Sequence, residues 1–429
     1  AQARRPKQLR IPSPKRQLGT MERAFGRSPT FLVGAASQRQ NLDNLVRREE
    51  HLAEEYCKNK PLCFAAGAYQ KTHPQKAQTG HRDADATVVS PMMLGVADGV
   101  SQVEEFGIDS SELPNELLQA CERVANSELV PDKGGRLAGS YRGPIPLMKE
   151  AYDATESLGS TTVALAVLDN STRIHGKLHP MIAVLSIGDC EVLILRQDRL
   201  TGQLFLCFQT EMQRIGGHCQ CPLQLCRVDD RVDPDFDERI AHEVIQRGSA
   251  VHNVSVYEGD IVIIGSDGVF DNLFHEEVIQ ICASMLPPDR YGKSFVPTDT
   301  GLLGRIAQQI VHACHVKTQV GPDGRYPETP IGKGGKRDDT SCVVGEVIEW
   351  TQQHTEAWAR KQSRQQWRDL LACGGLLAAC YPDSTHQNGA LCQALDESVV
   401  QNASFSKDAS FASDDDEAEE EDARTCTIS

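Results

Sequence analysis

At 429 residues, the chain is long enough for one large domain or two ordinary ones. Hydrophobic residues make up 40% of it and charged residues 24%, a balance typical of a globular protein with polar appendages. The formal net charge of −16 argues against a nucleic-acid-binding protein, which normally presents a basic face, so we expect no nucleic-acid partner.

Charge is distributed unevenly between the two ends. Residues 1–27 are rich in Arg and Lys and contain one acid, Glu22, whereas residues 414–422 read DDDEAEEED. An Arg-rich, acid-poor start is typical of an organellar transit peptide and also of an unstructured basic arm. The sequence therefore leaves a mitochondrial or plastid location and a cytoplasmic one as alternatives.

Cysteine usage bears on the compartment. Fifteen cysteines are scattered along the chain, and many lie within apolar runs, as Cys282, Cys314 and Cys342 do. In such runs cysteine behaves as a small hydrophobic residue. We therefore expect an intracellular, reducing compartment. The longest apolar patch, 370–381, is too short to cross a bilayer, so no membrane span is expected.

Apolar periodicity and turn signals predict a series of strands and helices between Leu62 and Trp350. Before it we expect the basic arm and a surface helix at 42–58, and after it a polar helix and an acidic tail. In chain order the predicted elements are a strand at 63–70, a hairpin of 86–89 and 92–97, helices at 112–127 and 145–157, strands at 160–169, 180–187, 191–196 and 204–209, a loop at 210–250, strands at 251–257 and 260–267, helices at 274–285 and 301–318, and a strand at 340–349.

Many of these strands are neighbours joined by short turns, which favours antiparallel sheets. Helices segregated outside antiparallel sheets make an α+β layered fold rather than a doubly wound one. We divide the chain into residues 1–60 (arm and surface helix), 61–350 (a folded domain) and 351–429 (polar helix and tail).

Two apolar runs stop on an Asp-Gly pair. They are MLGVADGVSQ at 93–102 and DIVIIGSDGVFD at 260–271. One Asp-Gly after an apolar run is usually only a turn. Its recurrence suggests that two strand ends deliver the carboxylates of Asp98 and Asp267 to one place.

Further acids follow the same pattern. LSIGDCEV places Asp189 at a strand end, and GGKRDDTSCVV places Asp338 and Asp339 just before the last strand. Converging carboxylates repel one another unless cations lie among them. Oxygen ligands on strand ends suit Mg²⁺ or Mn²⁺, and two such ions would activate a water molecule for hydrolysis of a phosphoester.

Two aspartates, Asp83 and Asp85, open the hairpin whose other arm ends at Asp98. A turn centred on Pro91-Met92 places Asp85 opposite Asp98. A turn centred on Ser90-Pro91 places Asp83 there instead. The sequence alone leaves both registers open.

The ordered motifs LGVADGV, LGSTT, SIGDCEVLILR, GDIVIIGSDGVFDN and GGKRDDTSCVV resemble those of the type 2C metal-dependent serine/threonine protein phosphatases. The resemblance covers about 62–350 and is closest to the T-cell-activation phosphatase homologue branch. It implies an α+β, four-layered fold, with a β-sandwich of two antiparallel sheets flanked by helices on both faces.

The resemblance also implies roles for individual residues. Asp98 would bridge two Mg²⁺ or Mn²⁺ ions, Gly99 would offer its backbone carbonyl, and Asp267 and Asp338 would complete the pair. Asp189 matches the position linked to a weaker third ion. The implied activity is hydrolysis of phosphoserine and phosphothreonine in phosphoprotein substrates by attack of an activated water, with the chain acting as a monomer.

The first motif departs from the family pattern. Where relatives have Glu-Asp, this chain reads RDAD, and we favour Asp85 over Asp83 as the surviving metal-shell residue. The arginine that many members use for the substrate phosphate is also absent, which leaves Lys76 and Arg82 as nearby candidates. These departures keep open a non-catalytic phosphoprotein-binding module as the alternative function. A carboxylate-dependent nuclease fits the net charge poorly.

Overall fold

The computed structural model describes residues 60–131, 141–174, 176–198, 201–215, 221–288, 290 and 295–364. The predicted basic arm, the helix at 42–58 and the acidic tail lie outside these ranges. The chain divides into two units, Ala1–Glu356 and Ala357–Ser429, and the fold described below belongs to the first. The predicted polar helix is confirmed at 352–364. In the described ranges, no helix combines the length and apolar character needed to span a membrane.

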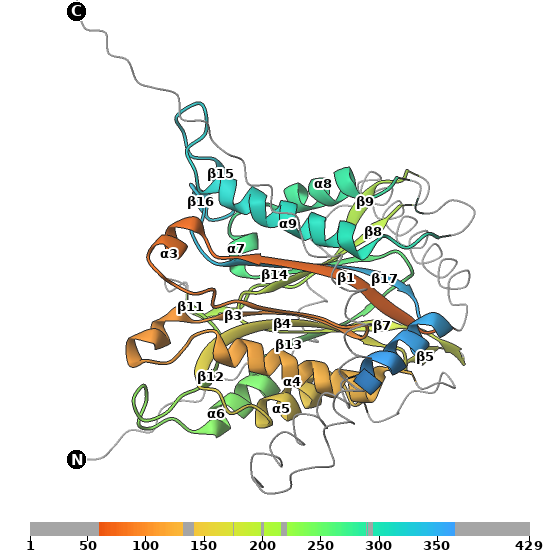
Figure 1. The fold of residues 1–429 in the computed structure, drawn as a ribbon, viewed down its shortest axis with the longest axis horizontal. Coiled ribbons are helices and arrows are strands. Elements are labelled where there is room, and N and C mark those ends of the chain that lie inside the picture. Colours follow the sequence, from red (N-terminus) through yellow and green to blue (C-terminus); the bar gives the residue numbers. More distant parts are fainter. Residues whose placement is uncertain are drawn as a thin grey trace, which may run out of the picture. The chain divides into compact units, whose positions relative to one another are not determined.

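One antiparallel sheet contains five strands (Figure 1). Their order is β1 (Leu62–Lys71), β17 (Thr340–Glu349), β14 (Ile261–Gly265), β8 (Glu191–Gln197) and β9 (Leu204–Gln209). The first and last strands of the domain are therefore direct neighbours. Lys60 forms an ion pair with Glu349, and the Trp350 amide donates a hydrogen bond to the Pro61 carbonyl.

The second antiparallel sheet packs against the first. Its order is β13 (Ala250–Ser255), β7 (Met181–Ile187), β4 (Gly159–Asp169), β3 (Met93–Gly99) and β2 (Ala86–Val89), and the short β12 (Leu225–Arg227) also pairs with β4.

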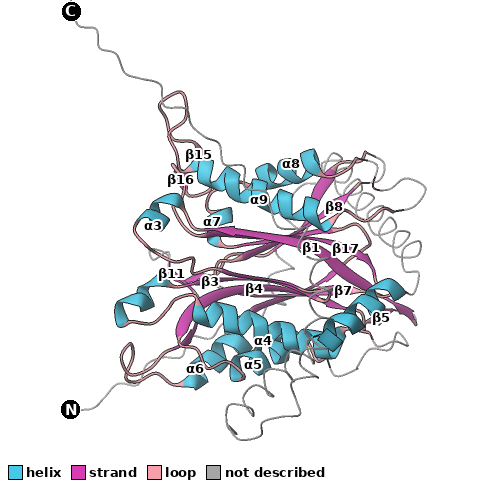
Figure 2. Ribbon diagram, viewed as in Figure 1, coloured by secondary structure: helices cyan, strands magenta, loops and turns pink. Residues whose placement is uncertain are grey.

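Helices cover the outer face of each sheet, which confirms the α+β layered sandwich (Figures 1 and 2). The helices α8 (His275–Met285) and α9 (Thr300–Lys317) lie on the first sheet, and α4 (Glu112–Leu129) and α5 (Pro144–Asp153) lie on the second. The shorter elements are α3 (Pro74–Gln78), η2 (Ser101–Phe106), α7 (Asp267–Phe270), β10 (Arg214–Ile215), β11 (Cys221–Pro222) and the hairpins β5–β6 (Arg173–Ile174, Lys177–Leu178) and β15–β16 (Glu328–Thr329, Gly332–Lys333).

The layering explains why β14 reads as an unbroken apolar run. Successive side chains of a strand point to opposite faces of the sheet. Val262 and Ile264 belong to the core between the two sheets, whereas Ile261 and Ile263 belong to the core beneath α8 and α9. Both faces are buried, so every position of the strand is apolar.

The predicted cysteines also belong to this core. Cys282, Cys314 and Cys342 are buried in the layer between the first sheet and its helices, as their apolar surroundings indicated.

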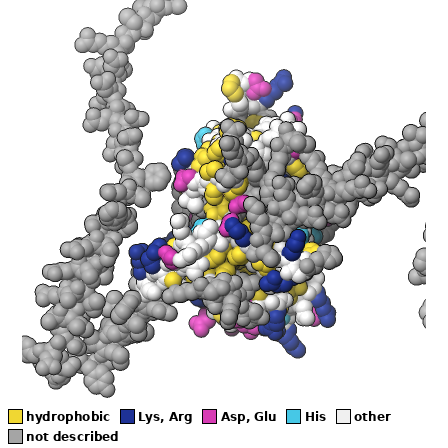
Figure 3. Space-filling model, turned by 90° about the vertical axis from the view of Figure 1, so that its right-hand side faces the viewer, with side chains coloured by type: hydrophobic (Ala, Val, Ile, Leu, Met, Phe, Trp, Pro, Cys, Tyr) yellow, Lys and Arg dark blue, Asp and Glu magenta, His cyan; other side chains and the backbone are white. Residues whose placement is uncertain are grey.

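Figure 3 shows the molecule from the right-hand side of Figure 1, where described apolar side chains reach the surface among Lys, Arg, Asp and Glu side chains.

The β2–β3 hairpin decides between the two registers that the sequence left open. The Ser90 amide donates a hydrogen bond to the Met93 carbonyl at 2.8 Å, so the loop residues are Pro91 and Met92. Ala86 pairs with Ala97, and the next position along each strand places Asp85 opposite Asp98.

The prediction of a loop over 210–250 was wrong in part. This segment contains β10, β11 and β12, the helix α6 (Glu238–Glu243) and the π-helical turn η3 (Val244–Gly248). The Asp237 side chain caps α6 by accepting a hydrogen bond from the Arg239 amide. Aspartates and a proline dominate the preceding sequence, so no apolar period predicts this helix, which packs on β12 and η3 and pairs His242 with Asp153 of α5.

A buried ion pair ties the first sheet to the chain that follows α8. Glu346 on β17 is fully buried, and its Oε1 lies 2.6 Å from the Arg290 guanidinium. The same carboxylate accepts hydrogen bonds from the amide and the hydroxyl of Thr298. Such a pair adds little net stability, but removing one partner leaves the charge of the other buried in the interior with less to compensate it.

Glu346→Leu should therefore lower the free energy of unfolding by about 3–5 kcal/mol, because the buried Arg290 would lose this carboxylate and the amide and hydroxyl of Thr298 would lose their acceptor. Urea unfolding followed by circular dichroism measures this. The double variant Glu346→Leu/Arg290→Met should recover most of the loss. A single variant as stable as the parent would show that the pair is not holding this part of the sheet.

Candidate functional site

Strand ends from both sheets deliver aspartates to one end of the sandwich. Asp98 is the penultimate residue of β3, and Asp267 follows the end of β14. Gly265 of β14 pairs with Glu191 at the start of β8 and with Cys342 near the start of β17. The residues just before β8 and β17, Asp189 and Asp338 among them, therefore reach the same edge as Asp267.

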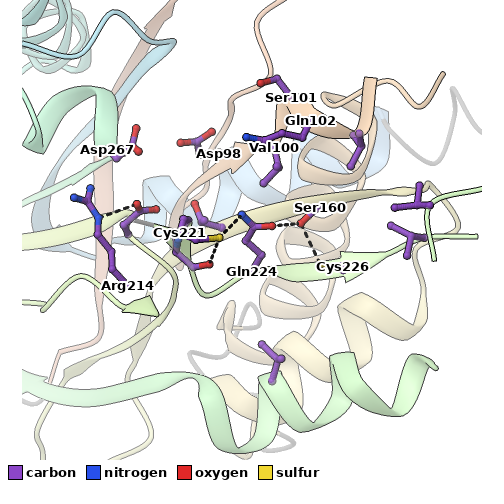
Figure 4. Close-up of a pocket in the computed structure, with 18 of the residues that line it drawn as sticks. Asp98, Val100, Ser101, Gln102, Ser160, Arg214, Cys221, Gln224, Cys226 and Asp267 are labelled. Atoms are coloured by element: carbon purple, nitrogen blue, oxygen red, sulfur yellow. Dashed lines mark hydrogen bonds and ion pairs between the residues drawn. The ribbon is translucent and has the colours of Figure 1, made fainter. Parts of the chain in front are cut away.

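These carboxylates line one pocket of about 860 Å³ (Figure 4). Five of the six residues predicted from the sequence contribute to its lining, namely Asp98, Gly99, Asp189, Asp267 and Asp338. The sixth, Asp85, lies behind the pocket lining and is 1% exposed. The structure therefore places five of the predicted residues in the lining of one pocket and Asp85 outside that lining, and their roles as metal ligands stay predictions.

Asp85 nevertheless lies close enough to the pocket for its charge to raise the pKa of Asp98. Burial, followed by the charge of Asp83, raises the pKa of the Asp85 carboxyl to about 8, and the hydroxyls of Ser341 and Ser266 offset only part of this shift. Neither carboxylate oxygen has a hydrogen-bond partner of ordinary geometry. Asp83 is less buried, and its Oδ1 accepts a hydrogen bond from the Asp85 amide.

Mutual repulsion dominates the electrostatics of the pocket. Burial and then the charges of Asp85, Asp267 and Asp338 raise the pKa of Asp98 well above its ordinary value. Burial and Asp267 likewise raise the pKa of Asp189 to about 6. The fold thus holds carboxylates closer together than their charges favour, which is the usual sign of a site that binds cations.

Two glycines beside the aspartates allow the close approach. A Cβ on Gly99 would lie 2.3 Å from the Ser110 carbonyl oxygen and 2.5 Å from that of Ala84. A Cβ on Gly268 would lie 2.1 Å from the carbonyl oxygen of Asp339. Only glycine fits at these positions, because backbone atoms cannot move aside as a flexible side chain can.

Three basic side chains lie among the carboxylates, and sequence reasoning singled out only one of them, Lys76. The Lys336 Nζ contacts Asp267 and lies 2.8 Å from the Asp338 Oδ2. Burial alone would raise the pKa of Asp338, but Lys336 and Lys76 hold it below its ordinary value. Lys336 had a signal, since it stands two residues before Asp338 in the motif GGKRDD.

Arg214 is the third cation, and no signal marked it. Its Nε lies 3.2 Å from Asp189, and its terminal nitrogen donates to both oxygens of Asp271, at 2.9 and 3.0 Å. It begins β10 in the segment predicted to be loop. Figure 4 shows its side chain beside the carboxylates at the pocket edge.

The two candidates for the missing arginine occupy different places. The Lys76 Nζ, on α3, lies 2.7 Å from Asp338 and 2.8 Å from Asp339, and Lys76 lines the pocket. The Arg82 side chain is 82% exposed and pairs with Asp109 at 3.1 Å. Lys76 is therefore the candidate that faces the site.

The residues present fit hard divalent cations. In the described ranges no three His, Cys, Asp or Glu side chains form a ready-made cage. However, several buried carboxylate oxygens accept no hydrogen bond, namely Asp85 Oδ1 and Oδ2, Asp189 Oδ1, Asp267 Oδ1 and Asp339 Oδ1. Mg²⁺ prefers oxygen ligands, keeps several waters and needs only one or two carboxylates from a protein.

The curated proteins that this chain resembles, as reported below, share one family name. No family model matches the chain. It is 26% identical over 298 residues to "Probable protein phosphatase 2C 26" of Arabidopsis thaliana, covering 67% of this chain and 85% of that protein. It is 28% identical over 314 residues to "Probable protein phosphatase 2C 55" of the same plant, covering 72% of this chain and only 58% of that one. Six further curated relatives, from Arabidopsis thaliana and Oryza sativa, carry the same family name.

Among solved structures, "X-ray structure of the photosystem II phosphatase PBCP" aligns with a TM-score of 0.46 at 22% identity. The alignment covers 66% of this chain and 98% of that one.

We expect Asp98 and Asp267 to be direct ligands. Asp98→Asn and Asp267→Asn should then each weaken Mn²⁺ binding at least about 100-fold, because such a loss costs more than the 10–100-fold typical of an outer partner. Asp189→Asn should cost less, since it lies at the pocket edge and is paired with Arg214. Isothermal titration calorimetry measures the affinities.

Glu150→Gln, an exposed position on α5, is the matched control and should bind Mn²⁺ as the parent does. In EDTA, Asp98→Asn should melt no lower than the parent, because it removes one of several repelling charges. Parent-like Mn²⁺ affinity in Asp98→Asn would remove this residue from the ligand set.

Proposed function

We propose that this chain, a member of the type 2C family of metal-dependent serine/threonine protein phosphatases, hydrolyses phosphoserine and phosphothreonine by direct attack of water at a binuclear centre. The observation that carries the proposal is the convergence of Asp98, Asp267 and Asp338 in one pocket that lysines also line. Assignment to the T-cell-activation phosphatase homologue branch stays a prediction, because the relatives' names do not distinguish branches.

The ligand set follows from the geometry and the resemblance together. Two Mg²⁺ or Mn²⁺ ions would share Asp98, with the Gly99 carbonyl, Asp267 and Asp338 completing the pair. Asp189 would serve a weaker third ion, and Asp85 would support Asp98 from behind. Bound ions of this kind lower the pKa of a water molecule and offset negative charge on a phosphoryl group.

The chain's own cations would bind the substrate phosphate. Lys76 and Lys336 place their ammonium groups at the wall of the pocket, within hydrogen-bond distance of Asp338. A phosphate dianion entering the pocket could accept hydrogen bonds from the same groups, which would hold the phosphorus in one orientation. Charge-assisted contacts of this kind also stabilise the charge that develops in phosphoryl transfer.

A non-catalytic phosphoprotein-binding module is the second candidate function. The altered motif at Arg82–Asp85 favours it, because one acid of the usual pair is displaced. The intact Asp98, Asp267 and Asp338 favour catalysis. Turnover of a phosphopeptide distinguishes the two, since the module would bind the peptide and return it unchanged.

We further propose that the chain acts as a monomer on phosphoprotein substrates in a reducing compartment. Nine cysteines in the described ranges carry free thiols, which suits such a compartment. Fractionation of cells that express the native protein would separate a mitochondrial or plastid location from a cytoplasmic one.

Removal of divalent ions should abolish the activity, because the proposed mechanism needs bound ions to lower the pKa of the attacking water and to offset the charge of the phosphoryl group. Release of inorganic phosphate from a phosphothreonine peptide should fall to background in EDTA and return when Mn²⁺ is added in excess. Phosphate release that persists at full rate in EDTA would contradict the metal-dependent mechanism.

Lys76→Met should lower kcat/KM by about 100-fold, the usual cost of losing one positioned donor to a developing charge. It should also weaken inhibition by inorganic phosphate. Arg82→Met is the matched control and should stay within about twofold of the parent, because Arg82 faces solvent. Steady-state kinetics on one phosphopeptide measures both. Equal losses in the two variants would mean that Lys76 has no special role.

A further inference from the structure

The pocket extends beyond the carboxylates into a region of different character. We call this region the apolar wall, and its residues are Val103 and Phe106 on one side and Val228, Val232, Phe236, Ile240 and Val244 on the other. None of them was identified from the sequence. The metal-binding and phosphate-binding groups proposed above do not involve them.

Large apolar side chains of this wall are open to solvent. Phe106 is 42% exposed and Ile240 is 54% exposed. Ile331, which also lines the pocket, is 44% exposed. Exposed apolar side chains gathered around one hollow mark a binding surface, whereas scattered ones need no explanation.

The wall is a preformed surface. β12 pairs with β4, the strand next to β3, which fixes the start of the wall two strands from Asp98. The Arg227 guanidinium stacks on the Tyr152 ring at 4.3 Å and pairs with Glu238 at 2.7 Å. On the far side, Arg231 donates a hydrogen bond to the Phe106 carbonyl, which joins the two sides.

The groups that would meet a substrate differ along the length of the pocket. At the carboxylate end, Lys76, Lys336 and Arg214 offset part of the negative charge, and together with the proposed metal ions they would meet an anionic phosphate. At the apolar end, the lining includes Asp233, for which no ion pair is found within the described residues. Its neighbours Asp230 and Asp235 are exposed as well. An occupant that spans the pocket would therefore be anionic at one end and apolar with a basic flank at the other.

We infer that the pocket selects phosphopeptides that carry a bulky apolar side chain within about two residues of the phosphorylated residue, together with a nearby Lys or Arg. This inference rests on the proposed phosphatase function and names its substrate class. A pocket of this volume is on the order of 10 Å across, which is the length of about three extended residues. The apolar side chain would pack on Val232 and Phe236, and the basic side chain would face Asp233.

The test compares matched phosphothreonine peptides of one length. The parent peptide has Leu beside the phosphothreonine and Arg nearby, the second replaces Leu with Ser, and the third replaces Arg with Gln. The parent should have a kcat/KM about tenfold higher than the second, the gain expected for burying most of one Leu side chain. It should also exceed the third, and by less at high salt, because that contact is between exposed charges.

Variants locate the preference on the wall. In Phe236→Ser the ratio between the Leu and Ser peptides should fall towards one, and Asp233→Asn should remove the preference for Arg. Val232→Ser serves if Phe236→Ser does not fold, as judged by its thermal melt. Ile174→Ser is the matched control, because Ile174 is 47% exposed and lies outside the pocket. It should keep the parent ratios.

Para-nitrophenyl phosphate separates the two possible failures, since it has no peptide flank. Turnover of this ester with equal kcat/KM for the Leu and Ser peptides would overturn the inference and leave the phosphatase function standing. A preference for the Leu peptide that persists in folded Phe236→Ser and in folded Val232→Ser would also overturn the inference. No turnover of the ester or of any peptide with Mn²⁺ present would instead overturn the proposed function.

Discussion

Repulsion among carboxylates is the constraint around which one end of this molecule is built. Asp85, Asp98, Asp189 and Asp267 come from different strand ends, and burial together with their mutual charges raises the pKa of several of them. Such an arrangement persists only if something stronger holds the strand ends in place. Here the two apolar layers do so, one between the sheets and one beneath α8 and α9. Lys76, Lys336 and Arg214 offset part of the repulsion and leave the rest available to cations.

The sequence could predict the carboxylate end because its signals are local. An apolar run that ends at Asp-Gly indicates where a strand ends, and the ordered motifs indicate which strand ends lie together. The hairpin register needed only one further fact, the position of the turn, and the hydrogen bonds of Ser90 and Met93 supply it. The burial of the Asp85 side chain could not be predicted from the sequence, because burial depends on which layers of the fold cover the end of a strand.

The parts that sequence reasoning missed are set by contacts between distant segments. Arg214 is defined by its pairing with Asp271, far along the chain, and a lone arginine in a polar stretch carries no such information. The helix α6 and the apolar wall depend on Arg227, which is held by Tyr152 on α5. The altered RDAD motif is also easier to interpret in three dimensions, because Arg82 points away to Asp109 while Asp85 keeps its place behind Asp98.

The pairing of β1 with β17 has a consequence for how the protein is made. Lys60 and Glu349, which face each other at the end of this ladder, are 289 positions apart in the chain. Local hairpins can bring Asp85 and Asp98 together early, but Asp338 arrives only when the last strand has left the ribosome and inserted between β1 and β14. Contacts of such long separation form slowly, because a large loop must close first. During synthesis the proposed ligand set is therefore incomplete until the sheet itself is complete, and a truncated nascent chain would expose the edge of β14.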